Sequence, residues 1–585
     1  MIARRLASSS LLAVTALLTV AAAGCDSCAK KSATSTSVVD AAPPAQESEV
    51  AAPESLVAEA TLTTPDAFWK KAQAGMGTTA AILPSTFAGL ACALAGLDPS
   101  VAREVDPNTP AYASIADLGA GFGFALAMRL TDPKHTQSML VDGAGAPFTS
   151  RDLGSMRVLA SKNAPLQMGV AIARAGWLLM ATNDADLASL GPYTYRTLPT
   201  RARPASAIEV RAPRPALAGP LRARLATEWS DAKAWLLKQD ADNRKKHDGR
   251  EPDFGDAPSL VACVDAFVQR RLAMVGDLED ARLALDAGDD EVHAILTMKP
   301  GAPAGVAAQQ LGSMHPGDGA PLLEAPLDAA AAWLFRDAAP ERAEDTREIA
   351  DCARRALGKR LGEDDAKKLA DAAEQWSKGR GDLLSAAVMW GSSRGLVAHA
   401  PAANGDAASH ALRDVVDLLQ RPVLKAPLAR YFHVSGIAVG GADVAGVGKV
   451  TAVTLTRDDP RTPKEKEKEK TKSPAPAPLG MAWATGASDV RFAIGDGAPQ
   501  LLGAAFKPKA TYADDASIAR AVRAFEGNVT FAVVAKPFRF EGDQRGGAPA
   551  PPFTFAWGRR AHDGWARVEI GYALLRELLR RTVGF

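Results

Sequence analysis

Short runs of alternating apolar residues, each followed closely by a proline, constrain the fold of this chain more than any other feature. Alternation with a period of two is typical of a strand with one buried face, and a proline cannot donate the ladder hydrogen bond that would continue it. Two further runs, 384–390 and 396–399, are separated only by a short turn, as in a hairpin. Because hairpins join antiparallel strands, antiparallel sheets are expected. The runs that stop before a proline are 124–130, 207–211, 291–298 and 529–535.

Amphipathic helical patterns lie between these runs. Leu217, Leu221, Leu225 and Trp229 recur every four residues, as on one face of a helix. Strands paired in hairpins, with helices between them, predict an α+β fold of mainly antiparallel sheets with flanking helices. The other predicted helices are 260–275, 346–357 and 364–376.

A weak internal repeat accompanies this pattern. The segments 165–171 and 478–484 both read Pro-Leu-x-Met followed three residues later by alanine, at an offset of 313 residues. In both copies a short hairpin follows, then a helical stretch and a strand that stops before a proline. We therefore expect an internal duplication, with one α+β module at residues 60–315 and a second at 316–585.

The segment 457–478 interrupts the second module. It contains an alternating Lys/Glu run, 464–470, followed by Pro-Ala repeats at 473–478. Alternating charges leave no apolar face, and prolines stiffen a chain without folding it. Since strand-like runs lie on both sides, we interpret this segment as a disordered loop that extends from a hairpin.

The N-terminus has the pattern of a secretory signal peptide. Arg4 and Arg5 precede an uncharged, leucine-rich stretch at residues 6–23. Small residues then lead to Gly24 and Cys25. A positive start, an apolar run and small residues before a cleavage point define such a signal.

The cysteine that directly follows Ala22-Ala23-Gly24 resembles the lipobox of bacterial lipoproteins. The resemblance implies that residues 1–24 are removed and that Cys25 carries lipid, so that the mature chain is attached to the inner or the outer membrane. It covers only about the first 25 residues. A conventionally cleaved signal peptide and an uncleaved anchor helix are the alternatives.

Residues 25–59 are predicted to form a flexible tether, because this stretch is rich in Ala, Pro, Ser, Thr and Glu and has few large apolar residues. The whole chain has 68 Lys+Arg and 67 Asp+Glu, for a net charge of +1. Loss of Arg4 and Arg5 with the signal peptide leaves −1. Such a balance argues against nucleic-acid binding, which needs surplus positive charge to neutralise phosphates. It also leaves membrane attachment to the lipid on Cys25.

Four cysteines remain besides Cys25, namely Cys28, Cys92, Cys263 and Cys352. Four cysteines allow three disulfide pairings, and the sequence does not choose among them. Cys263 and Cys352 each lie on the apolar face of a helical pattern, which favours buried thiols that pack like small apolar residues. No pair of cysteines has zinc-ligand spacing.

The sequence Gly391-Ser-Ser-Arg-Gly395 matches the G-x-S-x-G motif of serine hydrolases, with Ser393 as the nucleophile. His399, His410 and His433 follow in an order that a catalytic triad permits. A nucleophile elbow joins a strand to a helix, whereas the residues after Gly395 have the pattern of another strand. Gly, Ser and Arg also suit a hairpin turn, which is the interpretation we favour.

No metal or cofactor site is predicted. The eight histidines are scattered and form no H-E-x-x-H motif. Gly446-Val-Gly-Lys449 lacks the first glycine and the final Ser or Thr of a phosphate-binding loop.

The sequence therefore predicts a lipid-anchored protein of the cell envelope whose exported region binds or scaffolds a partner without catalysis. A tethered periplasmic solute-binding protein is the first alternative, and a deep cleft between two lobes would favour it. A serine hydrolase that uses Ser393 is the second. A flat or grooved apolar surface would instead favour a binding module.

Overall fold

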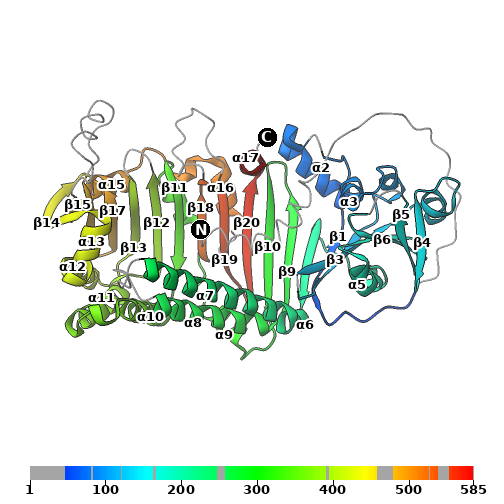
Figure 1. The fold of residues 1–585 in the computed structure, drawn as a ribbon. Helices are drawn as coiled ribbons and strands as arrows, with labels where there is room; N and C mark the ends of the chain where they lie inside the picture. The colour runs from blue at the N-terminus through cyan, green and yellow to red at the C-terminus, as the bar shows by residue number, and fades with distance from the viewer. Residues whose placement is uncertain are drawn as a thin grey trace. The chain divides into compact units, whose positions relative to one another are not determined.

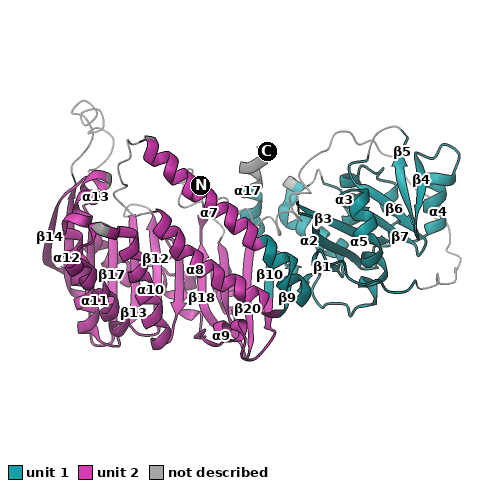
Figure 2. Ribbon diagram, turned by 60° about the horizontal axis from the view of Figure 1, so that its bottom comes forward, with its two compact units in different colours: residues 1–224, 279–296, 571–585 teal, residues 225–278, 297–570 magenta. Residues whose placement is uncertain are grey.

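The computed structural model describes residues 47–80, 83–119, 121–162, 166–246, 257–390, 394–457, 478–525, 528–537 and 552–583. The chain divides into two compact units (Figure 2). Unit 1 comprises residues 1–224, 279–296 and 571–585, and unit 2 comprises 225–278 and 297–570. Both units are therefore discontinuous in sequence, whereas the predicted modules were continuous.

The sheet of unit 2 contains ten antiparallel strands in the described residues. Their order across the sheet is β14-β15-β16-β17-β13-β12-β11-β18-β19-β20 (Figure 1). The strands are β11 (Ala329–Arg336), β12 (Leu383–Trp390), β13 (Arg394–Pro401), β14 (Val434–Val444), β15 (Gly448–Arg457), β16 (Leu479–Thr485), β17 (Asp489–Asp496), β18 (Val529–Ala535), β19 (Phe553–Arg560) and β20 (Asp563–Gly571).

The described strands of the first half of the chain form an antiparallel array with the order β4-β5-β6-β7-β3-β2-β1-β8-β9-β10. They are β1 (Leu56–Leu62), β2 (Ala111–Asp117), β3 (Phe122–Arg129), β4 (Phe148–Leu153), β5 (Met156–Ser161), β6 (Gly169–Ala173), β7 (Trp177–Ala181), β8 (Ile208–Pro213), β9 (Leu278–Ala287) and β10 (Glu291–Pro300).

The two orders are the same, with every strand of the first array replaced by the strand ten places later in the chain. The registers agree to within one residue. Gly169 pairs with Ala181 in β6–β7. Ala482, which lies 313 residues after Gly169, pairs in β16–β17 with Ala493, which lies 312 residues after Ala181. The sequence-level offset of 313 therefore matches these hairpins to within one residue. The predicted α+β fold, its antiparallel sheets and its internal duplication are confirmed.

The pairing of the first two strands of each repeat carries the same irregularity. The register shifts between the first and third residues of β1, Leu56 and Ala58, against β2. It also shifts between Ala329 and Ala331, the first and third residues of β11, against β12. A bulge is a specific feature of a strand pair, so its recurrence supports the equivalence that the strand order indicates. The first repeat runs from β1 to β10 and the second from β11 to β20.

Most helices occupy corresponding connections in the two repeats, but α6, α7 and α8, between β8 and β9, have no described counterpart between β18 and β19. In the first repeat the α-helices are α2 (Pro65–Met76), α3 (Phe87–Ala95), α4 (Pro133–Gln137), α5 (Asp184–Arg196), α6 (Arg214–Ala218), α7 (Pro220–Lys246), α8 (Ala257–Gly276) and, after β10, α9 (Val306–Gly312). In the second they are α10 (Ala339–Leu357), α11 (Glu363–Gly379), α12 (Gly405–Gln420), α13 (Pro422–Phe432), α15 (Ala498–Phe506), α16 (Ala516–Arg523) and α17 (Tyr572–Val583).

Two helical segments belong to the unit built mainly from the other repeat. Helix α8 and most of α7 lie between β8 and β9 of the first repeat but are part of unit 2. Helix α17 follows the last strand of the second repeat but is part of unit 1, where Tyr572 packs with Met76 of α2. A Cβ atom at Gly75 would lie 2.1 Å from the Tyr572 ring, so α2 needs glycine there to receive α17.

Helices pack on both faces of the unit 2 sheet. Leu501 and Leu502 of α15 and Ile518 of α16 join the largest core of this unit on one face. On the opposite face, Leu412 and Val416 of α12 cover β16 and β17 in a second core. Such layers bury a sheet on both sides.

The predicted tether at 25–59 is too long. β1 begins at Leu56 and is buried along most of its length. Before it, the Val50 amide donates to the Thr197 hydroxyl at 2.9 Å, so this segment is already fixed to the fold. Alanine and glutamate are weak strand formers, and for this reason Leu-Val-Ala-Glu-Ala-Thr-Leu was not recognised as a strand.

Several predicted segments lie outside the described residues, namely the signal peptide at 1–24, Cys25 and residues 458–477 of the charged loop. The strands on either side of that loop, β15 and β16, pair antiparallel as expected of a hairpin. Among the described residues, no helix has both the length and the apolar character needed to cross a bilayer.

Candidate functional site

The predicted hydrolase residues do not form a described catalytic group. Ser393 lies outside the described residues. His399 is on β13, with Nε2 3.9 Å from the Asp489 carboxylate, and burial lowers the pKa of its imidazole. His410 contacts Asp414 on its own helix at 2.9 Å, and His433 ends α13 in a left-handed backbone conformation. The three candidate bases therefore lie in separate environments.

In the described part of the chain, no three His, Cys, Asp or Glu side chains come together as metal ligands would. That the protein holds no metal or cofactor stays an expectation from its sequence.

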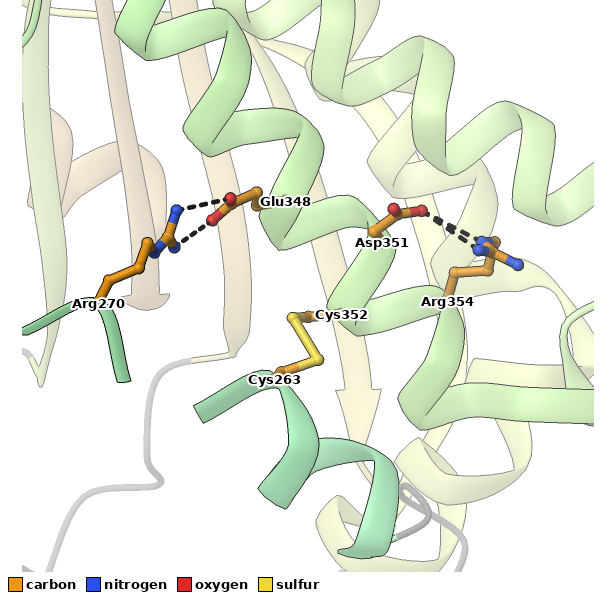
Figure 3. Close-up of a disulfide and its surroundings, with 6 residues drawn as sticks. All are labelled: Cys263, Arg270, Glu348, Asp351, Cys352 and Arg354. Carbon is orange, nitrogen blue, oxygen red and sulfur yellow. Dashed lines mark hydrogen bonds and ion pairs between the residues drawn. A yellow bond between two sulfur atoms is a disulfide. The ribbon is translucent and has the colours of Figure 1, made fainter. Parts of the chain in front are cut away.

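The prediction of buried thiols is wrong for Cys263 and Cys352. These residues form a disulfide that links α8 to α10 in unit 2, with their Cα atoms 5.8 Å apart (Figure 3). The sequence could not indicate this pairing, because α8 comes from the first repeat and α10 from the second. Cys92 of α3 is a free thiol, fully buried in the core of unit 1, and burial raises its pKa to about 12.

Unit 1 contains a buried charge network on its sheet. Glu59 of β1 accepts a hydrogen bond from the Tyr193 hydroxyl at 2.8 Å and pairs with Arg201 and, at 3.4 Å, with Arg211. Arg211 also donates to Asp280 at 2.6 Å. Both carboxylates are almost fully buried. Each carboxylate is therefore already paired with a guanidinium. Such a network stabilises the fold and does not indicate a ligand site.

Unit 2 contains a second such network at the ends of β11, α10 and α11. The Asp337 carboxylate accepts from Arg342 at 2.9 Å and from Arg380 at 3.0 Å. Arg342 also donates to the Ser377 carbonyl at 2.9 Å. Asp337, Arg342 and Arg380 are 4–5% exposed. This network fixes the start of α10 and the end of α11 to the sheet.

Unit 2 differs in one place from an ordinary closed core. Six large apolar side chains of β11, β18 and β19 share one face of the sheet, because they are direct or adjacent cross-strand partners. All six are only partly buried. We call this surface the aromatic face, and it consists of Trp333, Phe335, Phe531, Val533, Phe555 and Trp557.

On the opposite face of the same strands, the side chains are almost completely buried. Ala332, Leu334, Ala532, Val534 and Ala556 alternate with the aromatic face and are at most 1% exposed. The strands are thus fully covered on one side and incompletely covered on the other. The rings of Phe531 and Phe555, 6.1 Å apart, form part of the incompletely covered side.

The first repeat has a different kind of residue at the equivalent positions. Register matching aligns Trp333, Phe335, Phe531, Val533, Phe555 and Trp557 with Ala60, Leu62, Ile208, Val210, Leu283 and Leu285. Those aliphatic residues belong to, or pack against, the closed core of unit 1 that includes α3. In unit 1 these positions are aliphatic and four of the six, Ala60, Leu62, Ile208 and Leu285, are buried, whereas in unit 2 all six are only partly buried and most are aromatic.

Helices α7 and α8 both lie across strands β18, β19 and β20 of the sheet (Figures 1 and 2), and α8 contacts the aromatic face. The contact is through Arg271, whose guanidinium lies 5.0 Å from the Phe267 ring of α8 and 5.5 Å from the Trp557 ring of β19. Three apolar residues of α8, Leu260, Val264 and Phe267, are 44–50% exposed. The helix therefore adds to the apolar surface instead of closing it.

The sequence pattern alone does not predict the aromatic face. The run at 529–535 was predicted as a strand, whereas β19, which carries Phe555 and Trp557, was not among the predicted strands. Which face of these strands is covered depends on α8, a helix from the other repeat, and no local pattern shows this.

Comparison of the chain with protein-family models, with curated proteins and with solved structures finds no match.

Proposed function

We propose that this chain is an exported, lipid-anchored protein of the cell envelope, attached through Cys25, and that unit 2 binds an apolar ligand on the aromatic face without catalysing a reaction. The Cys263–Cys352 disulfide supports export, since disulfides form and persist mainly in oxidising compartments. The lipobox resemblance supports the anchor. The antiparallel sheets do not favour the alternative of a solute-binding protein with two parallel α/β lobes.

The partial exposure of the aromatic face is the observation that carries the binding proposal. Large apolar surfaces left open to water are costly and commonly mark interaction sites. Aromatic side chains supply much contact area with few rotatable bonds, and they dominate the affinity of many binding surfaces. The closed aliphatic core at the equivalent positions of unit 1 indicates that the fold does not itself require this exposure.

Binding of a neutral apolar fluorescent probe, N-phenyl-1-naphthylamine, tests the binding proposal. We expect the wild-type protein to bind the probe and the double variant Trp333→Ala/Phe555→Ala to bind it at least about ten-fold more weakly, because two large aromatic side chains of the face are truncated. Ile349→Ala is the matched control, since Ile349 is 70% exposed on α10 and outside the aromatic face. Equal affinity of the folded double variant and the wild type would contradict the proposal.

The anchor is tested separately. Cys25→Ser is expected to abolish fatty-acid labelling and normal removal of residues 1–24, because the lipid is added to the cysteine thiol. Stable attachment takes two lipid signals, and the net charge of −1 provides no general attraction to anionic membranes. Fatty-acid labelling and the mass of the N-terminal peptide measure this. A wild-type N-terminal peptide with a free Cys25 thiol would overturn the assignment.

A further inference from the structure

Two neighbouring arginines of α8 differ in their partners. Arg270 forms two hydrogen bonds with the Glu348 carboxylate of α10, at 2.8 and 2.6 Å (Figure 3). Arg271 forms no ion pair with any carboxylate among the described residues. Its position beside Phe267 and Trp557 places an uncompensated positive charge at the end of the aromatic face.

The donors of Arg271 are only partly used. Its Nη1 donates to Gln310 Oε1 at 3.2 Å and contacts Met274 Sδ at 3.9 Å. A guanidinium carries five N–H donors, and the described acceptors occupy those of one nitrogen. Burial and the charge of Arg270 lower the pKa of Arg271, while Asp345 opposes them from beyond ion-pairing distance. The side chain thus loses hydration without gaining a carboxylate.

A guanidinium in this setting is complementary to an anion, and the surface that leads away from it is apolar. Arginine binds carboxylates in a two-pronged geometry and stacks on aromatic rings at the same time. The three strands of the aromatic face lie about 4.8 Å apart, so the apolar surface extends roughly 10 Å across β19, β18 and β11. A ligand that matches both parts has an anionic head and an apolar chain.

We propose that the aromatic face binds a single-chain anionic amphiphile, with a long-chain carboxylate as its simplest form, and that Arg271 binds the carboxylate head. This inference rests on the proposed function and specifies its ligand. Phe267 and Trp557 hold the guanidinium in place, and the chain lies along the remaining aromatic side chains. Each methylene that leaves water is expected to increase the affinity about four-fold until the face is covered.

Competition between dodecanoate and 1-dodecanol tests this inference. The two compounds share a twelve-carbon chain and differ in the charge of the head, and both can be measured by displacement of N-phenyl-1-naphthylamine. We expect the wild type to prefer dodecanoate by about ten-fold, as one strong charge-assisted contact would give. In Arg271→Gln this preference should disappear while dodecanol binding is retained, and Arg271→Lys should restore part of it.

Arg270→Gln is the matched control. It removes the neighbouring guanidinium, which is half-exposed and paired with Glu348, and should keep the preference for dodecanoate. The inference is overturned if Arg271→Gln keeps the preference, or if Arg270→Gln loses it equally. It is also overturned if an apolar peptide of similar size displaces the probe more effectively than dodecanoate. Binding of dodecanol without a preference for the carboxylate would refute this inference alone, whereas no binding of either compound would refute the proposed function as well.

Discussion

Replacement of both Cys263 and Cys352 by serine is expected to lower the free energy of unfolding of unit 2 by about 4 kcal/mol. The disulfide closes a loop between residues 89 positions apart, and in the chain-entropy model a cross-link of this span restricts the unfolded chain by roughly that amount. The effect should be greatest at α8, because the exposed Leu260, Val264 and Phe267 show that apolar packing holds this helix only in part.

Denaturant unfolding and hydrogen exchange of α8 and α10 measure this effect. The double variant should unfold at lower denaturant concentration, and the amides of α8 should lose protection first. Cys92→Ala is a control for loss of a cysteine without loss of the disulfide, since Cys92 is a free thiol in unit 1. An unchanged unfolding midpoint together with full protection of α8 would show that the bond contributes little.

Asp337→Ala is expected to destabilise unit 2 by about 3–5 kcal/mol. Asp337 is the common acceptor of Arg342 and Arg380, and all three residues are almost completely buried. Removal of the carboxylate leaves two buried guanidinium groups without their counter-charge, which costs far more than the loss of an exposed pair. The ends of α10 and α11 should then separate from β11.

The matched control is Asp351→Ala, which removes the partner of Arg354 on the surface of α10. Both members of that pair are more than half exposed, so the change in the free energy of unfolding should be within about 0.5 kcal/mol. Denaturation of the two variants under the same conditions gives the comparison. Equal effects of the two substitutions would mean that the buried network does not stabilise the α10–α11 pair.

Local sequence pattern was sufficient to predict the fold class and the duplication. Strands such as 529–535 show clear alternation, and the Pro-Leu-x-Met match at 165–171 and 478–484 leads into hairpins whose registers agree to within one residue. β1 was missed because alanine and a buried glutamate, Glu59, interrupt its larger apolar residues. A buried glutamate looks like a surface residue in sequence, and only the arginines of distant elements make its burial possible.

The candidate site could not be predicted in the same way. Phe531 and Val533 lie in a run that was predicted as a strand, but their exposure depends on where the helices of unit 2 lie. Arg270 and Arg271 are adjacent and chemically identical, and they differ only because Glu348 of the other repeat reaches one of them. The disulfide has the same origin. What the sequence does not show is, in each case, a contact between elements of different repeats.

The exchange of helices between the repeats bears on the order in which the protein is made. A chain is synthesised from its N-terminus, and an N-terminal domain normally folds before the rest has appeared. Here the first unit cannot seat Tyr572 against Gly75 until residues 572–583 have been synthesised, and Cys263 must wait for Cys352. Any product that stops before residue 572 therefore leaves the space beside Gly75 unfilled. Maturation becomes a nearly all-or-none event, in which a protease can recognise an interrupted chain by a defect near its beginning.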